Sequence, residues 1–207
     1  DERRAISANI TGGMAFGDTG ERGTTLQTTL TVRPTSWMEL SPAIYYQRVA
    51  DAVAWVYPGG TIIDTTISSV PVSLFGTRNL EQLDLSLRGI VTFTRTLSVQ
   101  FFLQSFVARG EYRHYQWLAA DGRLHPYVSG GYGPLFAGND FNTVNFNANV
   151  LLRWEYLPGS AFYLVWTQGR FGDTGVYGTG VVRRVGDTWT LPRQDAIVLK
   201  ASYWFSL

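Results

Sequence analysis

The last stretch of the chain alternates between apolar and polar side chains up to its final residue. From 195 to 207, one side of an extended strand would carry the apolar residues Ile197, Leu199, Ala201, Tyr203, Phe205 and Leu207. The other side would carry Val198, Lys200, Ser202, Trp204 and Ser206. Successive side chains of a β-strand point to opposite faces. The pattern therefore predicts a strand with one apolar face that continues to the C-terminus.

The same two-residue period recurs along the whole sequence and predicts about eight antiparallel strands. We expect these strands at residues 3–17, 24–33, 38–47, 80–93, 97–107, 143–156, 162–166 and 195–207. A length of 207 residues suits one domain. The fold class expected from the sequence is all-β, with a single domain over residues 1–207.

The connections between these strands are of two lengths. Short turns are expected at 94–96, around Thr35 and around Gly159, from the pairings Phe93–Leu97, Val32–Met38 and Tyr156–Phe162. The opposite connections, at 51–79, 113–142 and 172–194, are long. Short turns at one end and long loops at the other, with both termini at the short-turn end, are typical of an up-and-down transmembrane β-barrel.

Composition narrows the class of protein. Charged residues make up 16% of the chain, below the quarter or so of soluble domains, and the formal net charge of +1 gives no basic footprint for nucleic acid. Cysteine is absent, so thiol chemistry and disulfides are excluded. No apolar run reaches the roughly 18 residues of a membrane helix. A membrane protein of this sequence would have to cross by closed β-structure.

A soluble lipocalin-type barrel alternates in the same way, and the polar face distinguishes it from a membrane barrel. A soluble exterior would be rich in Lys and Glu, whereas this face is dominated by amides, hydroxyls and scattered charges. We expect it to face the lumen of a membrane barrel, where opposite charges could pair between strands. The residues are Arg33, Glu39, Asp84, Arg88, Gln100, Gln104, Asn145, Asn147, Asn149, Arg153, Glu155 and Lys200.

The C-terminal strand is similar to the assembly signal of outer-membrane barrels in Gram-negative bacteria. Tyr203, Phe205 and Leu207 would form that signal, although the usual terminal residue is phenylalanine. Aromatic residues also gather near the short turns on the apolar face, as in an interfacial girdle. We therefore expect a bacterial outer-membrane protein whose partners are membrane lipid and the barrel insertion machinery.

Several segments resemble the C-terminal barrel domain of a bacterial family of unknown function. They are QLDLSLR at 82–88, LSVQ at 97–100, QSFVARGEY at 104–112, VLLRWEYLPGS at 150–160, FYLVW at 162–166 and LKASYWF at 199–205. In that family the barrel usually follows a module similar to family-nine carbohydrate-binding modules. The resemblance implies an outer-membrane location with a possible link to glycans. Members of the family are much longer, so a complete eight-stranded barrel and the C-terminal part of a larger barrel both stay open.

Residues suited to catalysis are few. The two histidines, His114 and His125, lie in one long connection, and Glu111 beside His114 suggests at most an acid/base pair. The glycine-rich segment 130–133 lacks the Lys-Ser/Thr of a phosphate loop. Asp173 and Asp187 lack the surrounding carboxylates of a calcium loop. We expect no enzyme, no cofactor and no metal.

A cluster of aromatic residues in the connection after the fifth strand is the remaining candidate for recognition. It comprises Tyr115, Trp117, Tyr127, Tyr132 and Phe136. Aromatic rings at an extracellular mouth stack on sugars, pack on another protein or fold over the rim. The function expected from the sequence is a structural or binding component whose loops recognise a glycan or another envelope protein. The alternative is a narrow pore, or part of a larger one, for small polar solutes or glycans.

Overall fold

The computed structural model describes residues 5–56, 61–65, 67–127, 139–173 and 180–205. Eight long strands form one antiparallel sheet in the order β1-β2-β3-β5-β6-β8-β9-β10. Their bounds are β1 Ile6–Phe16, β2 Arg22–Thr35, β3 Met38–Trp55, β5 Val72–Thr92, β6 Leu97–Leu118, β8 Phe141–Leu157, β9 Ser160–Asp173 and β10 Arg193–Ser202. Two short strands, β4 Thr61–Ile62 and β7 Leu124–Pro126, pair with β5 and β6. The expected all-β, up-and-down arrangement is confirmed.

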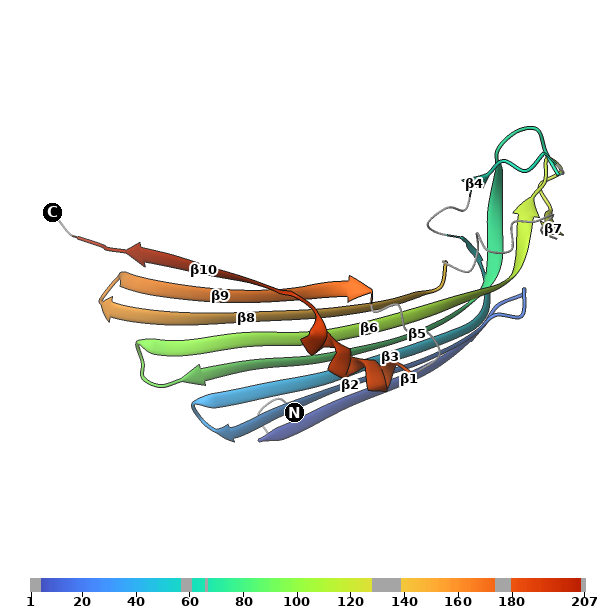
Figure 1. Ribbon diagram of the computed structural model, residues 1–207. Helices are drawn as coiled ribbons and strands as arrows, with labels where there is room; N and C mark the ends of the chain where they lie inside the picture. Colours follow the sequence, from blue (N-terminus) through green and yellow to red (C-terminus); the bar gives the residue numbers. More distant parts are fainter. Residues whose placement is uncertain (1–4, 57–60, 66, 128–138, 174–179, 206–207) are drawn as a thin grey trace.

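The sheet is open, so of the two alternatives that the sequence left open, the described residues do not form the closed eight-stranded barrel. β1 pairs with β2 alone and β10 with β9 alone, so each end of the strand order leaves one edge without a neighbour (Figure 1). Along β10 every residue is exposed, and along β1 nearly every residue. An up-and-down sheet closes only when its first and last strands form a ladder. That ladder is missing here.

Short turns and both described chain ends lie at the same end of the sheet. Phe93 pairs with Leu97, as predicted, around the loop Thr94–Thr96. The other two turns differ from the predicted register, because each contains a bulge: Val32 pairs with Leu40, and Trp154 with Phe162. Ile6 lies opposite Val32, and Ser202 lies opposite Ala161, next to these turns.

The opposite ends of β5 and β6 bend sharply away from the sheet and carry β4 and β7 with them (Figure 1). Irregular register accompanies the bend, between Val49 and Ala52 in β3 and between Phe75 and Thr77 in β5. Asp51 and His114 have positive φ angles of 60° and 49° at these places. Non-glycine residues rarely adopt such angles, and bulges redirect a strand in this way.

Beyond the bend, the described parts of two connections that we expected to be long loops contain strand, namely the first part of β5, the last part of β6, β4 and β7. Val56, Leu74 and Tyr112 form a small buried core there, with Ile62, Tyr115, Trp117 and Tyr127 packed against it. We call this part the loop-end unit. It gives the far end of the sheet a hydrophobic core of its own.

The connection between β9 and β10 contains a helical segment that alternation could not predict. α2 (Val181–Arg184) continues into the 3-10 helix η1 (Val185–Thr190), and the two lie across one face of the sheet (Figure 1). Val181 is fully buried against Leu83, Val107 and Val144. Arg170 holds η1 in place, since its Nη1 donates to the backbone oxygens of Trp189 and Leu191 at 3.2 and 2.9 Å.

The face that this segment covers is the predicted apolar face. Direct pairing places Leu87 beside Leu103 and Val91 beside Val99, and the row continues through Leu152, Leu164 and Leu199. Over most of its area no described second layer packs on this face, and Ile10, Ile44, Ile197 and Leu199 remain exposed. One glycine on this face, Gly89, is overlaid by the ring of Phe101 from the neighbouring strand.

We expect Gly89→Val to destabilise the sheet by about 1–3 kcal/mol, because a Cβ at this position would collide with the Phe101 ring. Gly169→Ala is the matched control, since a Cβ there meets nothing within 4 Å. The urea midpoint of each variant measures the effect. Equal midpoints for Gly89→Val and the wild type would contradict the packing of Phe101 over Gly89.

Candidate functional site: a groove on the polar face

All twelve predicted lumen residues share one face of the sheet. Gln104 lies directly opposite Asn147 on the neighbouring strand. Asp84 and Asn145 lie on either side of Phe106, and Arg153 and Lys200 lie on either side of Tyr163. One groove is lined by Glu39, Arg88, Gln100 and Asn149. Arg33 is hydrogen-bonded to Glu39, and Arg153 is hydrogen-bonded to Glu155. We call this side of the sheet the polar face. The register places the twelve on one face, and their position in a lumen stays a prediction.

Part of the charge on this face is paired, as expected. Arg33 Nε donates to Glu39 Oε2 at 2.7 Å, and Arg153 Nη2 donates to Glu155 Oε2 at 2.8 Å. Gln104 Nε2 donates to Asp84 Oδ2 at 2.5 Å. The first and third of these bonds link neighbouring strands, whereas Arg153 and Glu155 belong to the same strand. Two arginines of the polar face are therefore paired with carboxylates, whereas Asp84 is bonded to an uncharged amide.

An open groove of about 450 Å³ crosses the middle of the polar face. Its polar lining includes Glu39, Ser41, Arg88, Gln100 and Asn149. Its apolar lining was missed by the sequence analysis. On the polar face it consists of Ile90, Phe102, Leu151 and Val165.

These apolar residues lie almost in one row. Ile90 pairs with Gln100, Gln100 with Leu151, Leu151 with Val165, and Val165 with Val198. Phe102 lies two residues after Gln100 in β6 and is therefore on the same face. We call Ile90, Phe102, Leu151, Val165 and Val198 the apolar stripe. A signal existed in the sequence, because alternation is interrupted by consecutive apolar residues at 90–91, 101–103, 150–152, 164–166 and 197–199.

Arg88 stands beside the apolar stripe. Its guanidinium carbon lies 5.0 Å from the centroid of the Phe102 ring, a cation–π distance. The carboxylate that lines the same groove, Glu39, is bonded to Arg33 instead. Within the described part of the chain, Arg88 forms no ion pair. The groove therefore combines an apolar wall with a cation that no described carboxylate neutralises.

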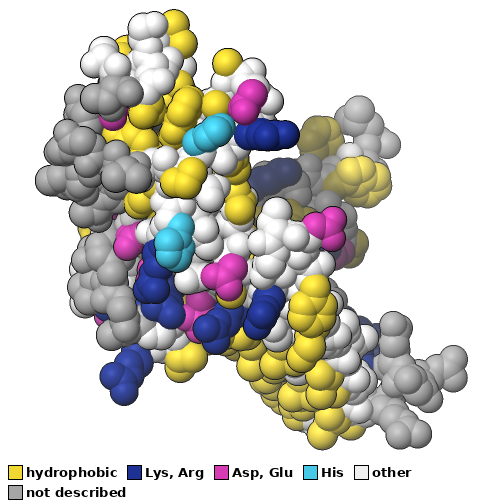
Figure 2. Space-filling model, turned by 90° about the vertical axis from the view of Figure 1, so that its right-hand side faces the viewer, with side chains coloured by type: hydrophobic (Ala, Val, Ile, Leu, Met, Phe, Trp, Pro, Cys, Tyr) yellow, Lys and Arg dark blue, Asp and Glu magenta, His cyan; other side chains and the backbone are white. Residues whose placement is uncertain are grey.

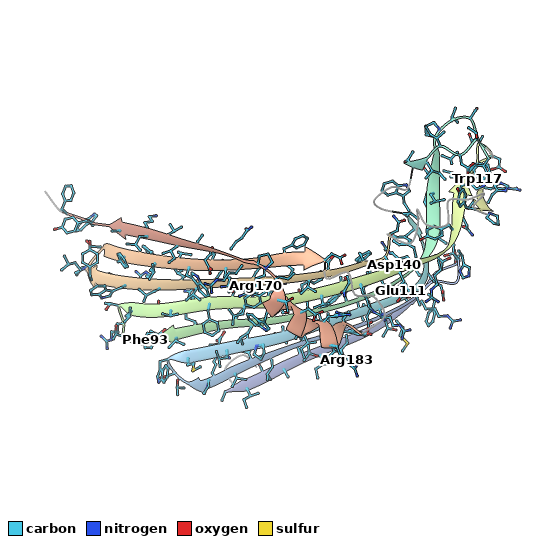
Figure 3. The ribbon with its side chains drawn as sticks, in the orientation of Figure 1. Phe93, Glu111, Trp117, Asp140, Arg170 and Arg183 are labelled. Carbon is cyan, nitrogen blue, oxygen red and sulfur yellow. The ribbon has the colours of Figure 1, made fainter. Side chains whose placement is uncertain are left out.

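The predicted aromatic loop is only partly a loop. Tyr115 and Trp117 lie in β6, and Tyr127 follows β7 directly. Tyr132 and Phe136 lie outside the described residues. The Tyr127 hydroxyl donates to buried Asp64 Oδ2 at 2.8 Å, and Trp117 packs against His125 with ring centroids 5.5 Å apart. Figure 3 shows Trp117 at the outer part of the loop-end unit, with Glu111 and Asp140 at the bend. These rings mainly build that unit.

Two pKa shifts follow from the contacts of the loop-end unit. Burial raises the pKa of the Tyr115 hydroxyl, with nearby Asp140 adding to the effect. The backbone N–H of Arg123 donates to Asp121 at 2.9 Å and is the main reason that the pKa of this carboxyl is lowered. His125 Nε2, 3.5 Å from Asp121, lowers it further.

A charged belt borders the apolar face where the sheet bends. It comprises Arg48, Glu81, Arg109, Glu111 and Arg113, and Figure 2 shows charged side chains crossing the middle of this end. Arg109 Nε donates to Glu81 Oε2 at 2.7 Å, and Arg113 Nη2 donates to Glu111 Oε2 at 3.0 Å. Glu111, the candidate acid/base residue, is thus held by arginines.

The candidate assembly signal is described as far as Phe205. β10 ends at Ser202, so the expected strand to residue 207 is too long, and Leu207 lies outside the described residues. Tyr203 and Phe205 are exposed on the same side, with stacked rings 6.1 Å apart. The Trp204 backbone N–H donates to Ser160 Oγ at 2.9 Å, which ties this end to the β8–β9 turn.

Within the described ranges, no group of three or more His, Asp or Glu side chains is placed to hold a metal ion. None of the described helices is long and apolar enough to cross a membrane.

The geometry defines a protein built on a single-layer, up-and-down antiparallel sheet with one apolar and one largely polar face. The chain belongs to the family described as Domain of unknown function (DUF5916), whose model matches residues 1–206. Searches of curated proteins and of solved structures found no match.

Proposed function

We propose that this domain forms part of the wall of a bacterial outer-membrane β-barrel and acts as a structural or binding component. Its apolar face would contact lipid, its polar face would line the interior, and the loop-end unit would face outward. The observation that carries the proposal is the large, continuous apolar face, of which the described residues cover only the part below α2–η1. Soluble monomers rarely expose such a surface.

The dimensions of this face suit a bilayer. From Leu97 to Val107 it extends ten residues along β6, or about 33 Å. Strands of membrane barrels tilt by about 35–45°, which reduces this length to roughly 25 Å along the membrane normal, the usual height of the apolar band. Exposed Phe93 and Trp154 border it at the short-turn end, and the charged belt borders it at the other.

The helical segment α2–η1 fits the outer part of this face. It covers Leu83, Val107 and Val144, but it presents Val182 and Trp189 outward, with 72% and 61% of their surfaces exposed. Trp189 packs on Phe146 with ring centroids 5.1 Å apart. An exposed tryptophan whose ring centroid lies 5.3 Å from the Arg170 guanidinium is the kind of side chain found at a membrane interface.

A lipid-facing position predicts different tolerance on the two faces of β5. Leu87→Arg should cost about 2–4 kcal/mol near the bilayer midplane, whereas the matched neighbour Ser86→Arg on the polar face avoids that transfer cost. Outer-membrane fractionation and heat-modifiable migration of the two variants measure the difference. Equal behaviour of the two variants would favour a soluble fold.

The open edges support a larger barrel as the parent structure. Unpaired backbone groups cost several kcal/mol each in lipid, and spanning β-structure is therefore closed. β1 has neither proline nor a charged residue to protect its edge. We therefore propose that further antiparallel strands pair with β1 and β10.

Hydrogen exchange tests this pairing in the protein held in lipid nanodiscs. About half of the β1 amides face the free edge, because a strand bonds each neighbour through alternate residues. With further strands in place, the amides of Ile6–Phe16 should all be protected. Rapid exchange at every second residue would show that the edge is free.

A pore is the second candidate function, favoured by the polar face and its open groove. Arg33, Arg88, Arg153 and Lys200 outnumber Glu39, Asp84 and Glu155 there, so an aqueous interior should carry a slight excess of positive charge. In planar bilayers we expect conductance with weak anion preference. A silent reconstituted protein would favour the structural or binding role.

A further inference from the structure

The polar face contains a feature that neither a lumen wall nor a conduit for polar solutes requires. The apolar stripe crosses five neighbouring strands, from Ile90 in β5 to Val198 in β10. Four strand spacings of about 4.8 Å give it a length of roughly 19 Å. That length suits an extended alkyl chain better than a single ring.

The stripe is accessible in the structure. Ile90 and Val198 are exposed by 37% and 57%, and the groove over the central residues is open. Ligand sites are usually concave, mostly apolar and equipped with a few polar groups that fix orientation. Here Arg88, Gln100 and Asn149 are the polar groups beside the apolar wall.

Arg88 determines the charge of the ligand. Its position over Phe102 leaves the edge of its guanidinium free of any described carboxylate, and Glu39 is already bonded to Arg33. A guanidinium is suited to bidentate recognition of a carboxylate. The same stacking on Phe102 places the cation next to an apolar surface.

We propose that this groove binds an amphipathic organic anion, with its carboxylate at Arg88 and its alkyl chain along the apolar stripe. The inference rests on the proposed function in one respect, namely that the polar face lines an interior rather than facing lipid. It names the ligand class of that interior surface.

The test uses the full chain in lipid nanodiscs, with decanoate as the probe and protein-free nanodiscs as the blank. Decanol and decyltrimethylammonium are the uncharged and cationic analogues. Calorimetry should show saturable binding of decanoate, weaker binding of decanol and none of the cationic analogue. A charge-assisted hydrogen bond is large enough for Arg88→Gln to weaken decanoate binding about ten-fold or more. The affinity for decanol should not change.

Three further variants separate this effect from a general loss of structure. Arg88→Lys keeps the charge without the bidentate geometry, so its decanoate affinity should lie between those of the wild type and Arg88→Gln. Leu151→Asn should weaken both decanoate and decanol, because it interrupts the stripe. Arg153→Gln, at a polar-face arginine that is paired with Glu155 and does not line the groove, should leave both affinities unchanged.

Equal decanoate affinity in the wild type and Arg88→Gln would overturn the proposal. So would the absence of saturable binding above the blank, the result expected if another part of the protein covers the stripe. Failure of the proposed function is distinguishable, because it appears in the fractionation of Leu87→Arg and not in these affinities. If decanoate binds saturably but Leu87→Arg fractionates as the wild type does, the proposed ligand site is supported and the proposed membrane position is rejected.

Discussion

Everything in this molecule depends on a sheet that is one layer thick. The backbone ladders between neighbouring strands hold it together, while the two clusters of buried hydrophobic residues in the described part of the chain lie in the loop-end unit and below α2. A single layer cannot bury its own apolar face, and its outer strands cannot satisfy their own outward backbone groups. The proposed lipid contact on one face and the proposed further strands at the edges would meet both requirements at once.

The irregular parts of the chain lie where this regular sheet has to end. Bulges and the positive φ angles of Asp51 and His114 redirect the strands at the bend, and the small core around Leu74 stabilises the part beyond it. The α2–η1 segment uses another means, since Val181 is buried on the sheet while Arg170 holds Trp189. Both devices place charged and aromatic groups at the same end of the apolar face.

Strand periodicity was sufficient to predict the eight long strands, their faces and the Phe93–Leu97 turn. It could not reveal closure, because alternation is a local property and pairing between β1 and β10 depends on how far the whole sheet curls. It also misplaced two turns, where bulges change the pairing by two residues. The α2–η1 segment escaped prediction because its four-residue helix is too short to show a helical period.

The candidate groove was missed for a related reason. Averaging over each strand makes the polar face look uniformly hydrophilic, since Gln100, Gln104 and the three asparagines dominate it. The apolar residues become significant only when the register brings Ile90, Leu151 and Val165 into one row, and five strands then interrupt their alternation at a similar height. A row of this kind is not needed to hold the sheet together, because the residues do not pack into a described core. Its physical consequence is an apolar surface beside an unneutralised arginine, and that combination favours an anion with an apolar body over a polar solute.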